Sequence, residues 1–128
     1  MLRARNDAGF SLVETLVALA VFAMAGVGLL QLQTYAAQSL ARVETRALAD
    51  MLAQNTLVDI AAARGPPPLG ARQQEVSFAA RDWRLAISVQ ATPDPVTRRV
   101  SVVVSPPSAD APAAAQAFAF VAAPESAP

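Results

Sequence analysis

The chain has 128 residues, no cysteine and no histidine, and its ten basic and ten acidic residues give a formal net charge of zero. With no excess of basic residues, the chain lacks the positive charge typical of nucleic-acid-binding proteins. The absence of cysteine and histidine removes the commonest nucleophile, general-base and metal-ligand chemistries. An enzyme would have to work with carboxylates or serine alone, so the composition predicts neither catalysis nor a cofactor.

A short polar leader, residues 1–9, precedes a long apolar segment, residues 10–32. The apolar segment is rich in Leu, Val, Ala, Phe and Met, and it is long enough to cross a membrane as a helix. Arg3 and Arg5 precede it, which favours a cytoplasmic N-terminus and a C-terminal domain on the other side of the membrane. About 90 residues remain for that domain, enough for one small core.

One charge stands near the start of the apolar segment. Glu14 is the only formally charged residue between Ala8 and Ala41. A carboxylate at the head of a membrane-spanning segment is costly in lipid, so it marks a functional position that needs a partner.

The run Gly9-Phe10-Ser11-Leu12-Val13-Glu14, with the leader before it and the apolar helix after it, resembles the prepilin peptidase site of type IV pilins and type II secretion pseudopilins. The resemblance implies cleavage between Gly9 and Phe10, N-methylation of the new N-terminal Phe10, and a role for Glu14 in filament assembly. Many type IV pilins close a C-terminal loop with a disulfide, so the absence of cysteine favours a pseudopilin.

Two other interpretations of the N-terminus stay open at this point. Ala23-Met24-Ala25 has the small-residue pattern of a secretory signal cleavage site, but the apolar run continues past it and Glu14 would lie inside the hydrophobic region. A plain signal anchor without cleavage is the second alternative.

The helix is expected to continue through residues 33–64 as an amphipathic half. Asn55 is placed on its inner, sheet-facing side, where a buried amide needs hydrogen-bond partners, and a structural role is favoured over a ligand site. The apolar residues that define the inner side recur at helical spacing: Leu40, Val43, Ala47, Leu48, Met51, Leu52 and Val58.

The triple proline within Gly65–Gly70 ends the helix because proline removes amide donors and fixes φ, and residues 65–73 are expected as a loop. Residues 74–122 alternate apolar and polar side chains, which predicts an antiparallel sheet packed on the helix through one face. Trp83, the single tryptophan, is expected at the centre of that core; a ligand-binding Trp platform is the weaker alternative.

Asp94, in Thr92-Pro93-Asp94-Pro95, is expected in a turn. A calcium site like that of major pseudopilins is the alternative, but no other carboxylate is close to Asp94 in sequence. Residues 105–116 are expected as a Pro/Ala-rich linker or loop, a short strand begins at Ala117, and residues 123–128 form a disordered tail. The predicted fold class is α+β and pilin-like, with a turn expected near Arg81-Asp82.

A second resemblance narrows the family. The helix pattern A-x-N-x-L at residues 53–57, then Trp83, then the Thr92–Pro95 turn and the Arg98–Val102 strand, are similar to the I-type minor pseudopilin of the type II secretion system. Membership implies a subunit of the pseudopilus tip that nucleates assembly for export of folded proteins, with no reaction of its own.

The implied partners are the J-type and K-type minor pseudopilins, the H-type and major pseudopilins, prepilin peptidase and the inner-membrane assembly platform. The implied location is the bacterial inner membrane, single-pass, with a periplasmic C-terminal domain. A minor type IV pilin or a DNA-uptake pseudopilin is the alternative, which the zero net charge and absent disulfide disfavour.

Overall fold

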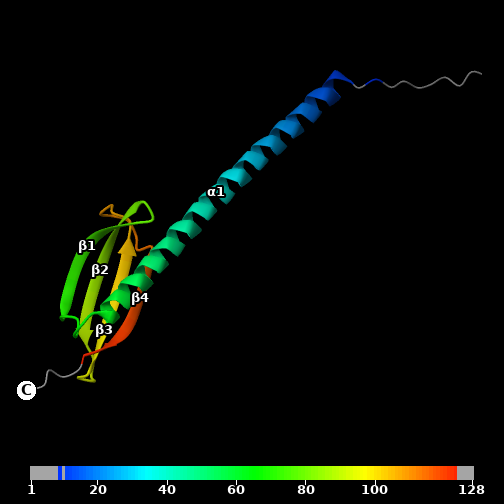
Figure 1. Ribbon diagram of the computed structural model, residues 1–128. Coiled ribbons are helices and arrows are strands. Elements are labelled where there is room, and N and C mark those ends of the chain that lie inside the picture. Colours follow the sequence, from blue (N-terminus) through cyan, green and yellow to red (C-terminus); the bar gives the residue numbers. More distant parts are fainter. Residues whose placement is uncertain (1–8, 10, 124–128) are drawn as a thin grey trace, which may run out of the picture. The chain divides into compact units, whose positions relative to one another are not determined.

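The computed structural model describes residue 9 and residues 11–123. The described residues form one helix and four strands (Figure 1): α1 (Leu12–Ala62), β1 (Gly70–Phe78), β2 (Arg81–Ala91), β3 (Thr97–Ser105) and β4 (Ala115–Ala122). The chain divides into two compact units, Met1–Ala41 and Arg42–Pro128, and α1 contributes residues to both.

Helix α1 begins with a hydrogen-bonded cap. The Glu14 backbone N–H donates to the Ser11 side-chain oxygen at 3.2 Å, and the Thr15 N–H donates to the Ser11 carbonyl at 3.1 Å. A helix leaves its first N–H groups without internal partners, and a serine at this position satisfies one of them. The order Ser-x-x-Glu is that of a capping box, so the local sequence determines where α1 begins.

The first unit exposes a long apolar surface. The large hydrophobic side chains from Leu12 to Leu32 are 55% to 78% exposed, and α1 has a stretch near its beginning that could cross a membrane by length and composition. With no core of its own to bury these side chains, this surface suits lipid or the helices of other membrane proteins.

The second unit contains a four-stranded antiparallel sheet in the order β1-β2-β3-β4. Each strand pairs with the next in the chain, as in Val76 with Trp83, Val89 with Val100 and Val102 with Ala117. Strands β1 and β4 therefore lie at the two opposite edges of the sheet (Figure 1).

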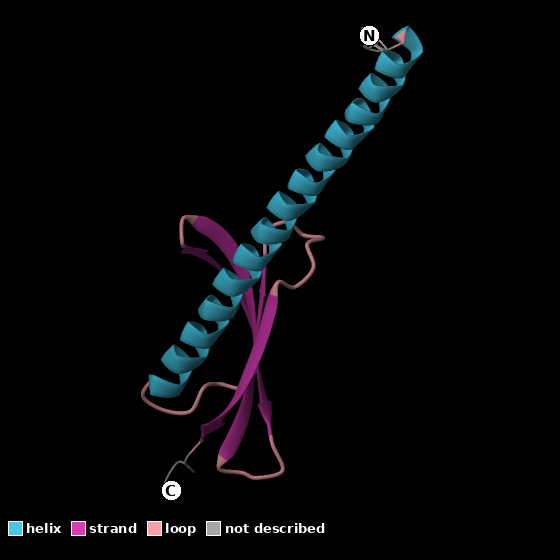
Figure 2. Ribbon diagram, turned by 90° about the vertical axis from the view of Figure 1, so that its right-hand side faces the viewer, coloured by secondary structure: helices cyan, strands magenta, loops and turns pink. Residues whose placement is uncertain are grey.

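The last turns of α1 pack on one face of this sheet (Figure 2). Arg81 at the start of β2 supports the packing, because its guanidinium forms an ion pair with Glu44 at 3.0 Å and a hydrogen bond with Thr45 at 3.1 Å. The predicted α+β fold, a long N-terminal helix on a small antiparallel sheet, is confirmed. The buried core consists of Ala49, Leu52, Ala53, Leu57, Ile60, Trp83, Leu85, Ile87, Val89, Val100, Val102, Val104, Ala115 and Val121.

The helix presents a different side to the sheet than the sequence predicts. Of the predicted stripe, Leu52 is buried and Leu48 half-buried, whereas Leu40, Val43, Met51 and Val58 are 55% to 70% exposed. Asn55, predicted on the inner side, is exposed. The buried set instead follows the spacing of Ala49, Leu52, Ala53, Leu57 and Ile60. Two overlapping apolar stripes run along this helix, and the one containing two alanines packs on the sheet, since small side chains allow the closest approach.

Several boundaries also differ from the prediction. Helix α1 ends at Ala62 rather than residue 64, and β1 begins at Gly70, within the predicted 65–73 loop. The first half of β1 is polar and exposed, so it lacks the apolar–polar alternation that marks a half-buried strand. This half is a strand because it pairs with β2. Ala123, assigned to the tail, is 4% exposed, and its N–H donates to the Val96 carbonyl at 2.7 Å. Residues 124–128 lie outside the described part.

The β1–β2 turn lies earlier than expected. Arg81 and Asp82 belong to β2, and the two connecting residues are Ala79 (φ 52°) and Ala80 (φ 58°). Two successive left-handed residues are the geometry of a type I′ hairpin turn, for which Asn-Gly or Asp-Gly is the usual sequence. Two alanines lack this sequence signature, so the sequence places the turn two residues too late.

Candidate processing and assembly site

The described part of the predicted processing segment comprises Gly9 and residues 11–14, of which residues 12–14 lie in the first turn of α1. Gly9 is exposed outside the helix, and Phe10 lies outside the described residues. Glu14 is exposed in the first helical turn, where its negative charge interacts favourably with the helix dipole. Neither of the two ion pairs found among residues 11–123 involves Glu14. Its carboxylate is therefore presented on the helix surface, open to a cation from outside the described residues.

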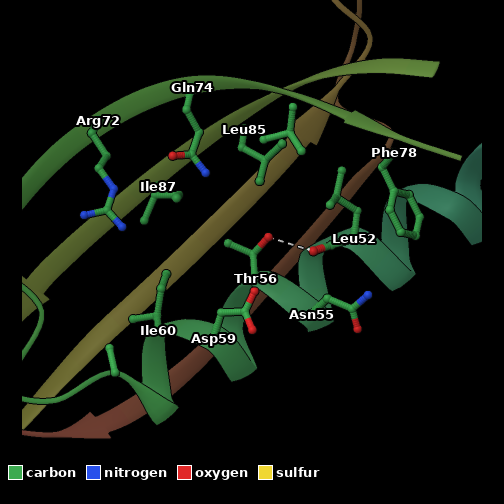
Figure 3. A pocket seen from close by; sticks show the side chains of 12 residues that line it. Leu52, Asn55, Thr56, Asp59, Ile60, Arg72, Gln74, Phe78, Leu85 and Ile87 are labelled. Carbon is green, nitrogen blue, oxygen red and sulfur yellow. Dashed lines mark hydrogen bonds between the residues drawn. The ribbon is translucent and has the colours of Figure 1, made fainter. Parts of the chain in front are cut away.

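A second candidate region is an open groove of about 510 Å³ between α1 and the inner face of β1 (Figure 3). On the inner side of β1, Val76 and Phe78 are half-buried against the core, whereas Arg72 and Gln74 are exposed. Asn55 and Asp59 approach it from the helix, and Arg72 and Gln74 from the strand (Figure 3). Apolar side chains line it as well: Leu52, Ile60, Val76, Phe78, Leu85 and Ile87.

Two charged groups of this groove are not paired with each other. Asp59 and Arg72 form no ion pair with each other in the described structure, so both charges are available to an outside group. The Thr56 hydroxyl donates to the Leu52 carbonyl at 2.8 Å (Figure 3), which uses its proton within the helix. Carboxylate, guanidinium and amide groups around an apolar floor can hold a polar-edged surface of another protein.

The two other predicted residues lie elsewhere in the second unit. Trp83 is 2% exposed and belongs to the core. Asp94 lies between β2 and β3, where its two carboxylate oxygens accept hydrogen bonds from the Val96 N–H at 3.1 Å and the Thr97 hydroxyl at 2.8 Å. Both oxygens are thus used by the turn, and no cluster of three metal-binding side chains occurs among the described residues.

Comparison with known families assigns the chain. The family model described as type II secretion system (T2SS), protein I, matches residues 43–122. The chain belongs to this family. A second model, the prokaryotic N-terminal methylation motif, matches residues 4–30, a range that contains Gly9, Phe10 and Glu14.

Individual relatives agree with the assignment to the protein I family. Type II secretion system protein I of Pseudomonas aeruginosa is 39% identical over 105 residues, which is 82% of this chain and 79% of the relative. Those of Pectobacterium carotovorum subsp. carotovorum and Klebsiella pneumoniae are 36% and 31% identical over 100 residues, each covering 78% of this chain and 83% of the relative.

Protein I is a minor pseudopilin, a structural component of the secretion system that works together with other pseudopilins. The methylation motif makes this chain a prepilin peptidase substrate, and the apolar start of α1 makes it a single-pass membrane-anchored protein. The sequence interpretation overlooked Ser11, although the Ser-x-x-Glu spacing of the cap was readable from the sequence.

Proposed function

We propose that this minor pseudopilin is a tip subunit that nucleates the pseudopilus of its type II secretion system. The observation that carries the proposal is the protein I match over residues 43–122, joined to the methylation motif over residues 4–30. The pseudopilus then grows beneath the tip and pushes folded proteins through the outer membrane. The partners in this proposal are the J-type and K-type minor pseudopilins in the tip, the H-type and major pseudopilins below it, and the inner-membrane assembly platform.

Processing in this proposal occurs between Gly9 and Phe10, on the cytoplasmic side of the inner membrane, and leaves the second unit in the periplasm. The arginines in the leader support this orientation because basic residues are retained on the cytoplasmic side. Cleavage gives a chain whose first residue, Phe10, carries a cationic amine even after methylation. Glu14 is then the fifth residue of the mature chain.

The Glu14 carboxylate pairs with the Phe10 amine of a neighbouring subunit and sets the axial register between them. The exposed position of Glu14 in the first turn supports this role, because a partner can approach it directly. An ammonium and a carboxylate attract far more strongly in a low-dielectric helix bundle than in water, although each loses hydration. Pairing with the amine of the same chain is the competing arrangement.

Deleting the gene in its native host tests the system to which the chain belongs. We expect the exported substrates to accumulate in the periplasm, and a plasmid copy to restore their secretion. Recovery of the J-type and K-type pseudopilins with a tagged chain would support the tip position. Normal secretion together with lost twitching motility or lost DNA uptake would overturn the proposal in favour of a minor type IV pilin or uptake pseudopilin.

A further inference from the structure

The two edge strands of the sheet differ in charge. Strand β4 has the sequence Ala-Gln-Ala-Phe-Ala-Phe-Val-Ala, without a single charged residue, whereas β1 carries Arg72 and Glu75. Natural sheets protect exposed edges with charged side chains, because an unprotected edge is a template for pairing with another strand. The β1 edge has this protection and the β4 edge lacks it.

The free backbone groups of β4 can be identified from its pairing. The Ala123 N–H donates to the Val96 carbonyl across the β3–β4 pair. Successive residues of an antiparallel strand direct their N–H and C=O groups to opposite sides. The backbone groups of Phe118 and Phe120, together with those of Gln116 and Ala122, therefore point away from β3, toward the open edge.

The side chains of the same strand form an aromatic patch on the outer face of the sheet. Phe118 and Phe120 are 57% and 62% exposed, and their rings meet edge to face with centroids 6.2 Å apart. The Arg99 guanidinium lies 4.8 Å from the centre of the Phe118 ring. Aromatic side chains on an edge strand stabilise an added strand through cross-strand pairs.

Strand direction decides which neighbour fits this edge. Three antiparallel pairings separate β1 from β4, so the two edges run in opposite directions. A like-folded subunit in the same orientation consequently offers its first strand antiparallel to β4. If two β4 strands paired symmetrically and antiparallel, the second copy would be inverted, including the part of α1 that packs on its sheet. Two chains anchored in the same membrane cannot adopt this arrangement.

We propose that β4 is extended by the first strand of a different, like-folded subunit, which joins the two sheets into one. A first strand without charged residues fits this edge, because β4 offers no charge with which to pair. A second copy of this chain does not fit, since its own first strand carries Arg72 and Glu75. The protected β1 edge also prevents open-ended head-to-tail growth of this chain alone. This inference rests on the proposed function, in which the chain assembles with other pseudopilins.

Four variants of the full-length chain test the strand pairing by co-purification with the other pseudopilins of its system from detergent-solubilised membranes. F120P removes an edge-facing N–H and leaves the β3–β4 ladder intact, and we expect about tenfold or greater loss of one partner. F120A keeps the N–H and should cost less. F120K adds a charge at the β4 edge and should abolish recovery of the same partner. S77K adds a charge to the same sheet face at the β1 edge and should behave like the wild type.

A photo-crosslinking residue at position 118 locates the contact. We expect its adduct in the first strand of one other pseudopilin. Equal losses for F120P and F120A, or an adduct in a helix, would overturn strand pairing, and an adduct at twice the mass of the chain would show a second copy instead. Circular dichroism of each purified variant checks that the sheet is retained. Failure of the wild type to recover any pseudopilin would contradict the proposed function, whereas wild-type recovery that F120P and F120K leave unchanged contradicts this inference alone.

Discussion

The indole N–H of Trp83 donates a hydrogen bond to the carbonyl oxygen of Phe78 at 3.2 Å, and this bond spans the hairpin turn between β1 and β2. Trp83 is also among the largest fully buried side chains. The residue that fills the core therefore also donates a side-chain hydrogen bond to the last carbonyl of β1, next to the two left-handed alanines of the turn. Core packing and turn geometry are coupled through this one side chain.

We expect W83F to lower the free energy of unfolding of the second unit by about 2 kcal/mol, because phenylalanine leaves part of the Trp83 volume empty and removes the indole hydrogen bond to the Phe78 carbonyl. Urea denaturation of the full-length chain in detergent micelles, followed by circular dichroism, measures the change. An unchanged midpoint would mean that the bond and the packing contribute nothing to stability.

The turn itself should respond in the opposite direction. Replacing Ala79 and Ala80 by Asn-Gly should raise the free energy of unfolding by about 1 kcal/mol, since this pair adopts the left-handed conformation at lower cost than alanine. The same denaturation, followed by Trp83 fluorescence, measures the gain. A loss of stability would show that the turn does not have the I′ geometry.

Two adjacent helix residues test which side of α1 packs on the sheet. Leu52 is 6% exposed and Met51 is 55% exposed. L52A should cost about 3 kcal/mol of unfolding free energy, and M51A less than about 0.5 kcal/mol. Trp83 fluorescence again reports the unfolding. Equal costs for the two variants would contradict the packing described above.

The sequence predicts the sheet better than the helix face. Strict alternation at Trp83, Leu85, Ile87 and Val89 identifies the inner side of β2, and Val100, Val102 and Val104 that of β3; all seven are buried. A strand has only two faces, so the face with polar side chains identifies the other face as the buried one. The helix offers two overlapping apolar stripes, and only the sheet surface that it meets selects between them.

The candidate sites also differ in how well the sequence predicts them. The motif from Gly9 to Glu14 is local, so the sequence alone suggests the processing segment. The groove beside Asn55 depends on how α1 packs against the inner face of β1, and the open edge at Phe118 and Phe120 depends on strand order. Neither the groove nor the open edge can be predicted from a short stretch of sequence, because each depends on how distant segments pack.

Glu14 variants test the axial register. We expect E14A and E14Q to insert into the membrane and to be processed normally, but to enter the pseudopilus poorly, because neither can pair with an ammonium group. E14D keeps the charge and should retain part of the function. Immunoblotting of membrane and sheared fractions, together with a secretion assay, measures both steps. Full secretion by E14A would remove the basis for the pairing.

Processing as a pseudopilin is tested by the intact mass of the membrane-extracted chain, measured with and without active prepilin peptidase. We expect a mature chain that begins at Phe10 and carries one methyl group when the peptidase is active, and an uncut chain when it is not. A chain cut after Ala25, or one that still begins at Met1 in the presence of the peptidase, would contradict its processing as a pseudopilin.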